Sequence, residues 1–243
     1  MRSDFYRAFE ERYRGSRDQI KSRLRFYLPF VDVLRQQRQE LHLVDLGCGR
    51  GEWLELLREQ GYVALGVDLD DQMLAACRDL ELEVETADVL AWLTDRPDES
   101  CDVVSAFHLV EHLPFSGLEQ LVRHCLRVLR PAGLLILETP NPENIVVGAT
   151  NFYLDPTHQR PLPPPLLAFV PEYQGFGRTK IVRLQESVEL ATGRKPTLFD
   201  VLGGASPDYA VIAQKQGEDE EMAAFADLFD RDYGVKTDTL AWR

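Results

Sequence analysis

Residues 43–51, LVDLGCGRG, limit the possible folds of this chain more than any other segment. In them an apolar run passes directly into a turn with glycine at every second position. The apolar run, which carries Asp45, predicts a buried strand that delivers its backbone to a ligand. Gly47, Gly49 and Gly51 tolerate positive φ and let main-chain N–H groups approach a small molecule closely. A helix that begins near Gly51 would point its N-terminus at the same place.

A second acidic residue follows at the spacing that a nucleoside site requires. Asp68 ends the next apolar run, 63–68, about 20 residues further along the chain. At that position a carboxylate accepts hydrogen bonds from both hydroxyls of a ribose. A strand, a glycine turn, a helix and a strand that ends in Asp are together typical of a nucleoside-binding α/β unit.

The motif at residues 45–51, DLGCGRG, resembles the first motif of class I methyltransferases that depend on S-adenosylmethionine (SAM). NAD enzymes usually have two residues between the second and third glycines, whereas this turn has one. The resemblance implies SAM as cofactor, with Asp45, Gly47, Gly49 and Gly51 around its methionine part and Asp68 on the ribose. It also implies a Rossmann-like fold, with a mainly parallel seven-stranded sheet, helices on both faces and an antiparallel last strand.

Strand and helix patterns alternate along the middle of the chain, which independently predicts an α/β fold with a mainly parallel sheet. The expected strands are 41–46, 63–68, 82–86, 101–107 and 134–139, and the expected helices begin near Gly51, Asp70, Val89 and Phe115. Residues 129–133, LRPAG, predict a helix stop and turn before the fifth strand. Runs at 179–184 and 209–214 would add an antiparallel pair.

We expect three regions along the chain. Residues 1–40 show helical spacing of apolar residues, with Ser16 as an N-cap after a break, and would form a helical lid. Residues 41–216 would form the methyltransferase domain, in which the aperiodic segment 140–165 would be an acceptor loop. Residues 217–243 are acidic and would form a solvated helix or tail.

Composition limits the possible partners and the compartment. The net charge of −13 argues against broad binding to nucleic acid or to an anionic membrane. The N-terminus has no apolar signal segment, and no run reaches the length of a membrane span. The four cysteines are widely spaced and suit reduced core thiols. We therefore expect a cytoplasmic protein without a membrane span.

The resemblance also implies residues around the rest of SAM. The segment 87–89, ADV, matches the position that caps the adenine ring, so that Asp88 and Val89 would contact it. Asp88 equally suits a helix N-cap, and one residue can do both. Leu69 and Met73 would flank the ring, and Phe107, which ends the fourth strand, would lie close to the transferable methyl group.

The turn at residues 13–17, YRGSR, is a further candidate for the cofactor site. It is either a break between two amphipathic helices or a helix start that offers guanidinium and N–H donors to a carboxylate. SAM carries one carboxylate, and we favour Arg14 over Arg17 as its partner.

Residues 108–112, HLVEH, come directly after the fourth predicted strand and are the chemical candidates. In many class I methyltransferases a Glu-His pair at this position is structural. Some class I O-methyltransferases, including small-RNA 3′-terminal and ubiquinone-pathway enzymes, hold a divalent metal with Glu-x-x-Glu-His. Here His108 replaces the first Glu, and His158 could add a ligand, so His108, Glu111, His112 and His158 are candidate metal ligands.

An imidazole-rich set of this kind would suit zinc, manganese or iron better than magnesium. A metal or a base must help an alcohol to lose its proton, because its pKa lies far above neutrality. Without a metal, His108 or His158 would act as general base, and Glu111 completes the catalytic candidates.

The segment after the fifth predicted strand supplies the acceptor candidates. Short polar groups beside an aromatic face are typical of carbohydrate recognition, and the prolines at 161 and 163–165 would stiffen the loop. The alternative is a purely structural loop that caps the sheet. The acceptor candidates are Asn141, Asn144, Tyr153, Asp155, Thr157 and Arg160.

The wider pattern over about residues 11–185 resembles bacterial methyltransferases encoded with surface-polysaccharide enzymes, some of which terminate O-antigen chains of lipopolysaccharide. The resemblance implies O-methylation of a glycan or nucleotide-sugar hydroxyl, with a carbohydrate acceptor and a glycosyltransferase as partner or fusion. The alternatives are O-methylation of a small metabolite or an RNA 3′ end, although the net negative charge disfavours RNA. A non-catalytic SAM-binding subunit of a glycosyltransferase complex is a further alternative.

Overall fold

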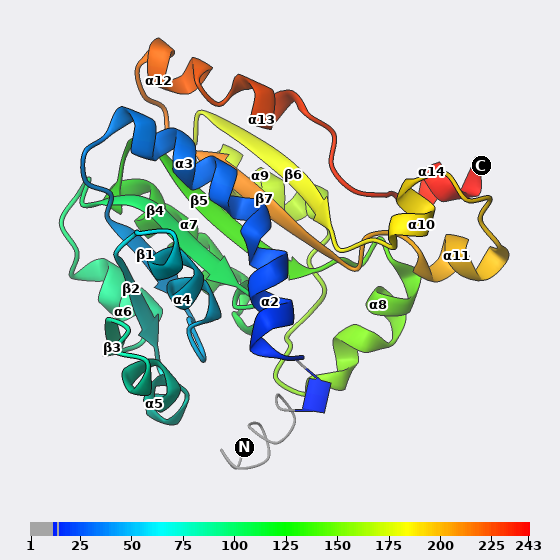
Figure 1. The fold of residues 1–243 in the computed structure, drawn as a ribbon, viewed down its shortest axis with the longest axis horizontal. Coiled ribbons are helices and arrows are strands. Elements are labelled where there is room, and N and C mark those ends of the chain that lie inside the picture. Colours follow the sequence, from blue (N-terminus) through cyan, green and yellow to red (C-terminus); the bar gives the residue numbers. More distant parts are fainter. Residues whose placement is uncertain (1–11, 14) are drawn as a thin grey trace.

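The computed structural model describes residues 12–13 and 15–243 of the chain. A seven-stranded sheet in the order β3-β2-β1-β4-β5-β7-β6 forms its centre (Figure 1). β7 runs antiparallel to both its neighbours and the other pairs are parallel, which confirms the predicted fold. The strands are β1 (Leu43–Leu46), β2 (Ala64–Asp68), β3 (Val84–Thr86), β4 (Cys101–Phe107), β5 (Leu129–Pro140), β6 (Arg178–Leu184) and β7 (Asp208–Gln214).

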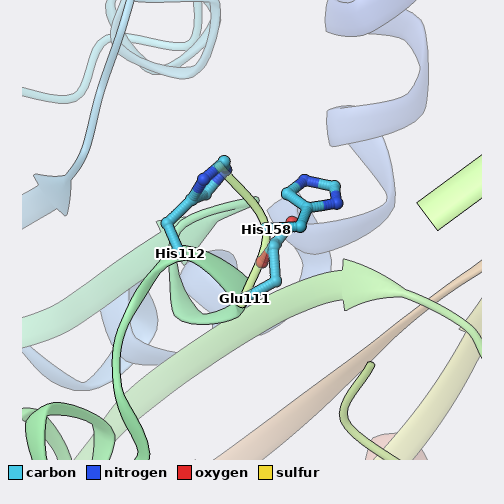
Figure 2. A group of neighbouring side chains, drawn as sticks. All are labelled: Glu111, His112 and His158. Atoms are coloured by element: carbon cyan, nitrogen blue, oxygen red, sulfur yellow. The ribbon is translucent and has the colours of Figure 1, made fainter. Parts of the chain in front are cut away.

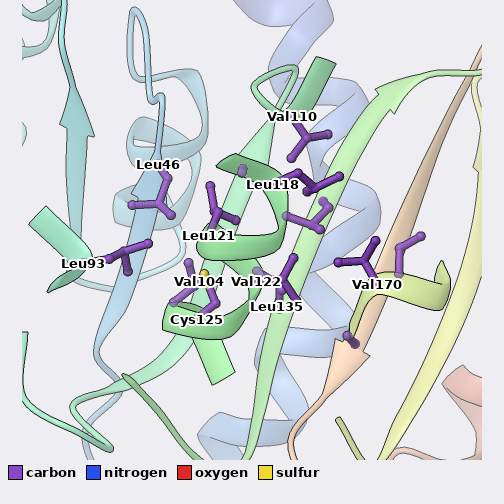
Figure 3. Packing of buried hydrophobic residues seen from close by; sticks show 14 of the residues in the cluster. Leu46, Leu93, Val104, Val110, Leu118, Leu121, Val122, Cys125, Leu135 and Val170 are labelled. Atoms are coloured by element: carbon purple, nitrogen blue, oxygen red, sulfur yellow. The ribbon is translucent and has the colours of Figure 1, made fainter. Parts of the chain in front are cut away.

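Helices cover both faces of the sheet, since successive strand side chains point to opposite sides. Val103 and Leu134 pack with α2 (Arg17–Leu24), α3 (Leu28–Gln37) and α4 (Glu52–Glu59), and α2 and α3 cross in front of the sheet in Figure 1. Val104 and Leu135 pack on the other face (Figure 3). The helices of that face are α6 (Val89–Thr94), α7 (Phe115–Val128) and α9 (Pro164–Gln174).

The remaining helices are short, apart from α5 (Asp71–Asp79), which packs against the glycine turn. Beyond the end of β5, four of them gather beside one another at the right of Figure 1. These are α8 (Ile145–Ala149), α10 (Val188–Ala191), α11 (Leu198–Gly203) and α14 (Thr237–Ala241). Three 3-10 turns are η1 (Arg25–Tyr27), η2 (Val110–His112) and η3 (Asn151–Leu154). Within the described residues, no helix has the length and apolarity needed to cross a bilayer.

The turn predicted at residues 129–133 is instead the first part of β5. Leu129 pairs with Cys101, and the register of the ladder then shifts before Val103 pairs with Leu134. Pro131 donates no hydrogen bond, and Ala132 has a φ of 59°, so a bulge accommodates both within the strand. The preceding helix does end where the sequence indicated, at Val128.

The N-terminal helices belong to the core layer of the sheet. Ser16 caps α2 as predicted, because its hydroxyl accepts from the Gln19 N–H and the Gln19 side chain accepts from the Ser16 N–H. Tyr27 and Leu34 are fully buried against the sheet. The first part of the region that we expected to form a lid, residues 1–11 and 14, lies outside the described residues.

The acidic C-terminal segment also packs on the fold, which corrects the prediction of a solvated helix or tail. It forms α12 (Asp219–Ala223), α13 (Ala226–Asp230) and α14. Phe225 has no exposed surface, and Phe229, Val235 and Leu240 are buried as well. A few spaced apolar residues fix the segment, and the acidic side chains between them face solvent.

Candidate active site

The glycine turn has the backbone that the sequence predicts. Gly47, Gly49 and Gly51 have φ values of 68°, 53° and 76°, in the left-handed region where other residues are strained. The Gly47 N–H donates to the Val67 carbonyl over 2.7 Å and ties the turn to β2. A Cβ on Gly51 would lie 2.7 Å from the Cys77 sulfur, so the turn also has no space for a side chain there.

Two predicted carboxylates lie beside this turn. The Asp68 carboxylate accepts from the Gly49 N–H and from the Asp70 N–H, each over 2.8 Å. Asp45 is 3% exposed, and its Oδ1 accepts from the Ser105 hydroxyl over 2.7 Å. Parallel strands β1 and β2 therefore bring both acids to one edge of the sheet, as the motif predicts.

The predicted adenine side lies along the start of α5 and α6. Leu69 is exposed, whereas Met73 and Val89 are buried. Asp88 is the N-cap of α6, because its Oδ1 accepts from the N–H groups of Leu90 and Ala91 at 3.0 and 2.9 Å. The N-cap interpretation of Asp88 is confirmed, and its contact with adenine stays a prediction.

A cavity opens between the glycine turn, α2 and the ends of β4 and β5. The predicted residues Asp45, Gly47, Phe107 and His108 all line it. Sequence reasoning missed its other walls: Ile20, Arg23, Leu24, Cys48, Glu52, Trp53, Glu138 and Gln185. Glu138 could have been found by the same rule as Asp68, since it is an acidic residue near the end of a buried strand.

Aromatic rings shape the wall of this cavity near Phe107. Its ring lies 5.1 Å from that of Tyr27 and 5.6 Å from that of Trp53, centroid to centroid. Tyr27 comes from η1 and Trp53 from α4, so the N-terminal helices and the glycine-turn helix meet at the end of β4. Phe107 is therefore packed between these two rings, and its position near the transferable methyl group stays a prediction.

His108 lies between two carboxylates. Its Nδ1 is 3.2 Å from Glu111 Oε1, and its Nε2 is 3.3 Å from Glu138 Oε1. Burial works against a charge on the ring, but the hydrogen bonds to Glu111 and Glu138 outweigh it and raise the pKa of His108 well above its ordinary value. A charged imidazole with both nitrogens donating does not suit the general-base role predicted for His108.

The same network extends to both sides of His108. Tyr27 donates a hydrogen bond to Glu138 Oε2. Burial disfavours the charged form of Asp208 and raises its pKa to about 6, although the nearby charge of His108 works in the opposite direction. Burial alone would raise the pKa of Glu111, but the hydrogen bond from His108 outweighs it and lowers that pKa. The site thus places the His108 imidazole among several carboxyl groups.

Three of the four predicted metal ligands converge. Ligand atoms of Glu111, His112 and His158 lie within 4.8 Å of one another, and in Figure 2 the Glu111 carboxylate lies beside the two imidazole rings. His108 is not part of this group, since its nitrogens face Glu111 and Glu138. The structure therefore brings together three of the four candidates, and metal binding by them stays a prediction.

Hydrogen bonds fix which nitrogen of each clustered ring is free. His158 Nδ1 lies 2.6 Å from the Phe152 carbonyl, an acceptor, so Nδ1 carries the hydrogen. His112 Nδ1 lies 2.8 Å from the Thr157 hydroxyl, whose own hydrogen goes to Asp155 at 2.6 Å. If the rings are neutral, Nε2 carries the lone pair in each, with His158 Nε2 lying 3.9 Å from Asp155 Oδ2. Burial lowers the pKa of His112, which favours the neutral form of that ring.

Two of the acceptor candidates serve the fold instead. The Asn141 side chain is fully buried, donates to the Ser206 carbonyl and accepts from the Glu143 N–H. Asn144 caps α8 and donates to the carbonyls of Gly203 and Ala205. These amides tie the end of β5 to the segment before β7, which argues against the predicted contact of Asn141 and Asn144 with the acceptor.

The other acceptor candidates divide into two groups. Asp155 and Thr157 position His112 through the hydrogen bonds described above. Tyr153 is 63% exposed, and the Arg160 guanidinium lies 4.7 Å from the centroid of the Phe115 ring. Tyr153 and Arg160 are therefore the two of these residues with surface open to a ligand.

The structure describes one of the two candidate arginines of the N-terminal turn, Arg17. Arg14 lies outside the described residues. Arg17 joins α2 to α4, because its guanidinium donates to Glu55 and to the Arg50 carbonyl at 2.7 and 2.9 Å. Arg17 is thus engaged in helix packing, and the role of Arg14 stays a prediction.

The fold and the nucleoside-type site define a class I SAM-dependent methyltransferase, and comparisons with known proteins agree. Residues 15–165 match the family described as a methyltransferase domain, so the chain belongs to this family. A crystal structure of a SAM-dependent methyltransferase from Archaeoglobus fulgidus is 34% identical, with a TM-score of 0.77 over 87% of this chain and 100% of that one. PH0226 from Pyrococcus horikoshii, 16% identical with a TM-score of 0.63, shares the fold.

Curated relatives match the chain in part. A probable SAM-dependent methyltransferase of Mycolicibacterium smegmatis is 32% identical over 134 residues, which are 55% of this chain and 51% of that protein. A ubiquinone biosynthesis O-methyltransferase of Methylococcus capsulatus is 32% identical over 123 residues, 46% of this chain and 51% of that protein. The chain spans about half the length of the curated relatives it matches.

Proposed function

We propose that this methyltransferase transfers the SAM methyl group to oxygen, on a hydroxyl group of its acceptor. The observation that carries the proposal is the cluster of Glu111, His112 and His158, with two free imidazole lone pairs. One hydrogen bond, from His108 to Glu111, joins the cluster to the wall of the cavity beside the glycine turn. A hydroxyl needs such help, because it is a poor nucleophile until its proton is removed.

In this proposal the three residues hold a divalent metal ion. Two imidazole nitrogens and one carboxylate oxygen suit zinc, manganese or iron. When bound, the ion would lower the pKa of the acceptor hydroxyl. Asp155, Thr157 and the Phe152 carbonyl keep the rings oriented, which is the usual task of groups behind metal-binding histidines. Without an ion, His158 Nε2 is the group that would accept the proton.

The cofactor lies across the glycine turn in this proposal. Asp45 and the turn N–H groups would face the methionine part, Asp68 the ribose, and Asp88 with Leu69 and Met73 the adenine. Phe107 would then lie near the methyl group, beside the cavity wall that His108 and Glu138 complete. Transfer requires the acceptor oxygen, the methyl carbon and the sulfur nearly in line, so positioning supplies much of the rate.

The acceptor that we propose is a sugar hydroxyl of a glycan or nucleotide sugar. The exposed Tyr153 ring and the Arg160 guanidinium, both near the cluster in sequence, would suit a carbohydrate face and its polar groups. Similarity to ubiquinone biosynthesis O-methyltransferases favours a second candidate, the hydroxyl of a small aromatic metabolite.

The test follows a labelled methyl group. We expect protein supplied with 13C-methyl SAM and candidate sugars or phenols to give a product whose 13C shift identifies an O-methyl group. His158→Ala should lower turnover by about 100-fold or more and reduce bound metal, because one ligand or base is lost. His124→Ala, a change on α7 outside the cluster, is the control. A methyl group on nitrogen or carbon, or full activity of His158→Ala, contradicts the proposal.

A further inference from the structure

A second cavity, of about 420 Å³, continues from the one at the glycine turn. The two share Arg23, Glu138 and Gln185 as walls, so they lie side by side, and the first cavity is also lined by His108. We call the second cavity the outer groove. It runs between the N-terminal helices and the C-terminal segment, and its size is that of a small-molecule site. Its walls include Ser22, Arg23, Phe26, Gln185, Glu186 and Tyr233.

The outer groove combines aromatic and short polar groups. The Phe26 and Tyr233 rings meet edge to face at 5.3 Å, which gives the groove a rigid apolar wall. Glu186 is fixed by a hydrogen bond of 2.8 Å from the Ser206 hydroxyl. A sugar unit presents apolar C–H faces and many hydroxyls, and rigid aromatic and polar walls recognise both. Tyr233 also gives the acidic C-terminal segment a part in this wall.

The charged side chains of the outer groove bear on whether a bound sugar is neutral or charged. Arg183 is held by Glu143 at 2.6 Å, and Glu138 interacts with Tyr27 and His108. The Arg23 guanidinium, in contrast, makes no hydrogen bond or ion pair with a side chain that the structure describes, although Arg23 lines both cavities and its charge acts on Asp208. A guanidinium in such a position is suited to a carboxylate or a phosphate, which it binds through two N–H donors.

The backbone supports a ligand-binding role at the junction of the cavities. Gln185, directly after β6, has a φ of 69°, in the left-handed region that is costly for a residue with a side chain. Such strained residues cluster at ligand-binding sites. With this backbone conformation, Gln185 lies in the wall of both cavities.

From these observations we infer that the acceptor is an anionic saccharide, bearing a carboxylate or a phosphate, bound in the outer groove with its charge on Arg23. Its reacting hydroxyl would extend past Gln185 and Glu138 to the cavity at the glycine turn. The inference rests on the proposed transfer to a sugar hydroxyl and adds the charge of the acceptor and the surface that holds it.

The test measures binding of three probes to the full chain saturated with S-adenosylhomocysteine: glucuronic acid, glucose 1-phosphate and glucose. We expect one or both charged probes to bind at least about tenfold more tightly than glucose, and Arg23→Gln to abolish that preference. The two charged arms tell a carboxylate from a phosphate. Arg25→Gln is the matched control, since Arg25 lies on the next turn and faces Glu59 at 3.7 Å.

Two results would overturn the inference. In one, Arg23→Gln weakens binding of S-adenosylhomocysteine, which would assign the guanidinium to the cofactor carboxylate. In the other, the charged probes bind no better than glucose, or their preference survives in Arg23→Gln. Because binding is measured without turnover, these results are distinct from failure of the proposed O-methyl transfer, which the labelled product reports.

Discussion

At the scale of single residues, His108 at the carboxyl edge of the sheet connects the two candidate sites through its side-chain contacts. His108 separates the cavity at the glycine turn from the cluster of Glu111, His112 and His158 by interacting with Glu138 on one side and Glu111 on the other. Its φ of 53° lies in the left-handed region and turns the chain directly after β4. The interactions of His108 with Glu111 and Glu138 raise its pKa, which favours an electrostatic role for the ring.

Asp208 gives a pH-dependent prediction at the scale of one residue. Burial raises its pKa to about 6 in the folded protein, whereas an unfolded Asp titrates near about 3.9. Ionising it therefore costs more when the protein is folded, and the stability that the protonated form contributes is lost as the pH rises from about 4 to about 6. We expect Asp208→Asn to be more stable than the parent by about 2–3 kcal/mol above pH 6 and nearly equal to it at and below pH 4.

Urea unfolding at several pH values measures this difference. Asp79→Asn is the control, because Asp79 is exposed and its substitution should leave the stability difference flat with pH. A difference between Asp208→Asn and the parent that does not change between pH 4 and 7 would contradict the assignment.

At the scale of elements, the N-terminal helices form one wall of the site. Lys21 on α2 bonds to Glu55 and Glu59 on α4 at 2.9 and 2.5 Å, so α2 is fixed to the helix that follows the glycine turn. Tyr27 then continues this contact to the end of β5 through its hydrogen bond to Glu138. These helices therefore supply one wall of the cavity beside the glycine turn, through Ile20, Arg23 and Leu24.

Tyr27→Phe tests that contact between elements. The ring stays, but the buried Glu138 carboxylate loses a donor, so we expect a loss of about 1–3 kcal/mol in the free energy of unfolding. Tyr62→Phe is the control, since it removes a similar bond to the exposed Asp32 and should cost less than about 1 kcal/mol. Both losses are measured by denaturant unfolding. Equal losses would show that the buried hydrogen bond to Glu138 contributes no more stability than the exposed one to Asp32.

At the scale of the whole molecule, the C-terminal segment completes the layer on one face of the sheet. Phe225 and Phe229 pack with Phe30 of α3, and the Arg178 guanidinium of β6 lies 4.1 Å from the centroid of the Phe229 ring. Residues nearly two hundred positions apart in the chain thus share one core. The segment also supplies Tyr233 to the outer groove.

Phe225→Ala should therefore destabilise the entire protein. Removing a fully buried ring leaves a cavity, and we expect a loss of about 3–5 kcal/mol with a matching fall in Tm. Phe199→Ala, at a 74% exposed position on α11, should change stability by less than about 0.5 kcal/mol. If the two variants melt at the same temperature, the segment is the solvated tail that its composition predicts.

The sequence by itself determined the features that depend on local backbone and on strand order. The glycine turn, Asp45, Asp68 and the N-caps Ser16 and Asp88 follow from short-range rules, because φ values and first-turn N–H groups are set within a few residues. Alternating strand and helix patterns likewise predicted a mainly parallel sheet, since crossover connections leave few other arrangements.

Only the tertiary structure decided which side chains share surroundings. The sequence predicted that Asn141 and Asn144 contact the methyl acceptor. In the structure their side-chain amides instead donate hydrogen bonds to backbone carbonyls some sixty residues away. The sequence predicted His108 as a metal ligand. In the structure its Nε2 faces Glu138 of the neighbouring strand, and this contact helps to raise the pKa of His108. Hydrogen bonding and burial depend on partners that are distant in the chain, and no local pattern records them. The glycine turn could thus be found in the sequence, whereas the outer groove required the fold.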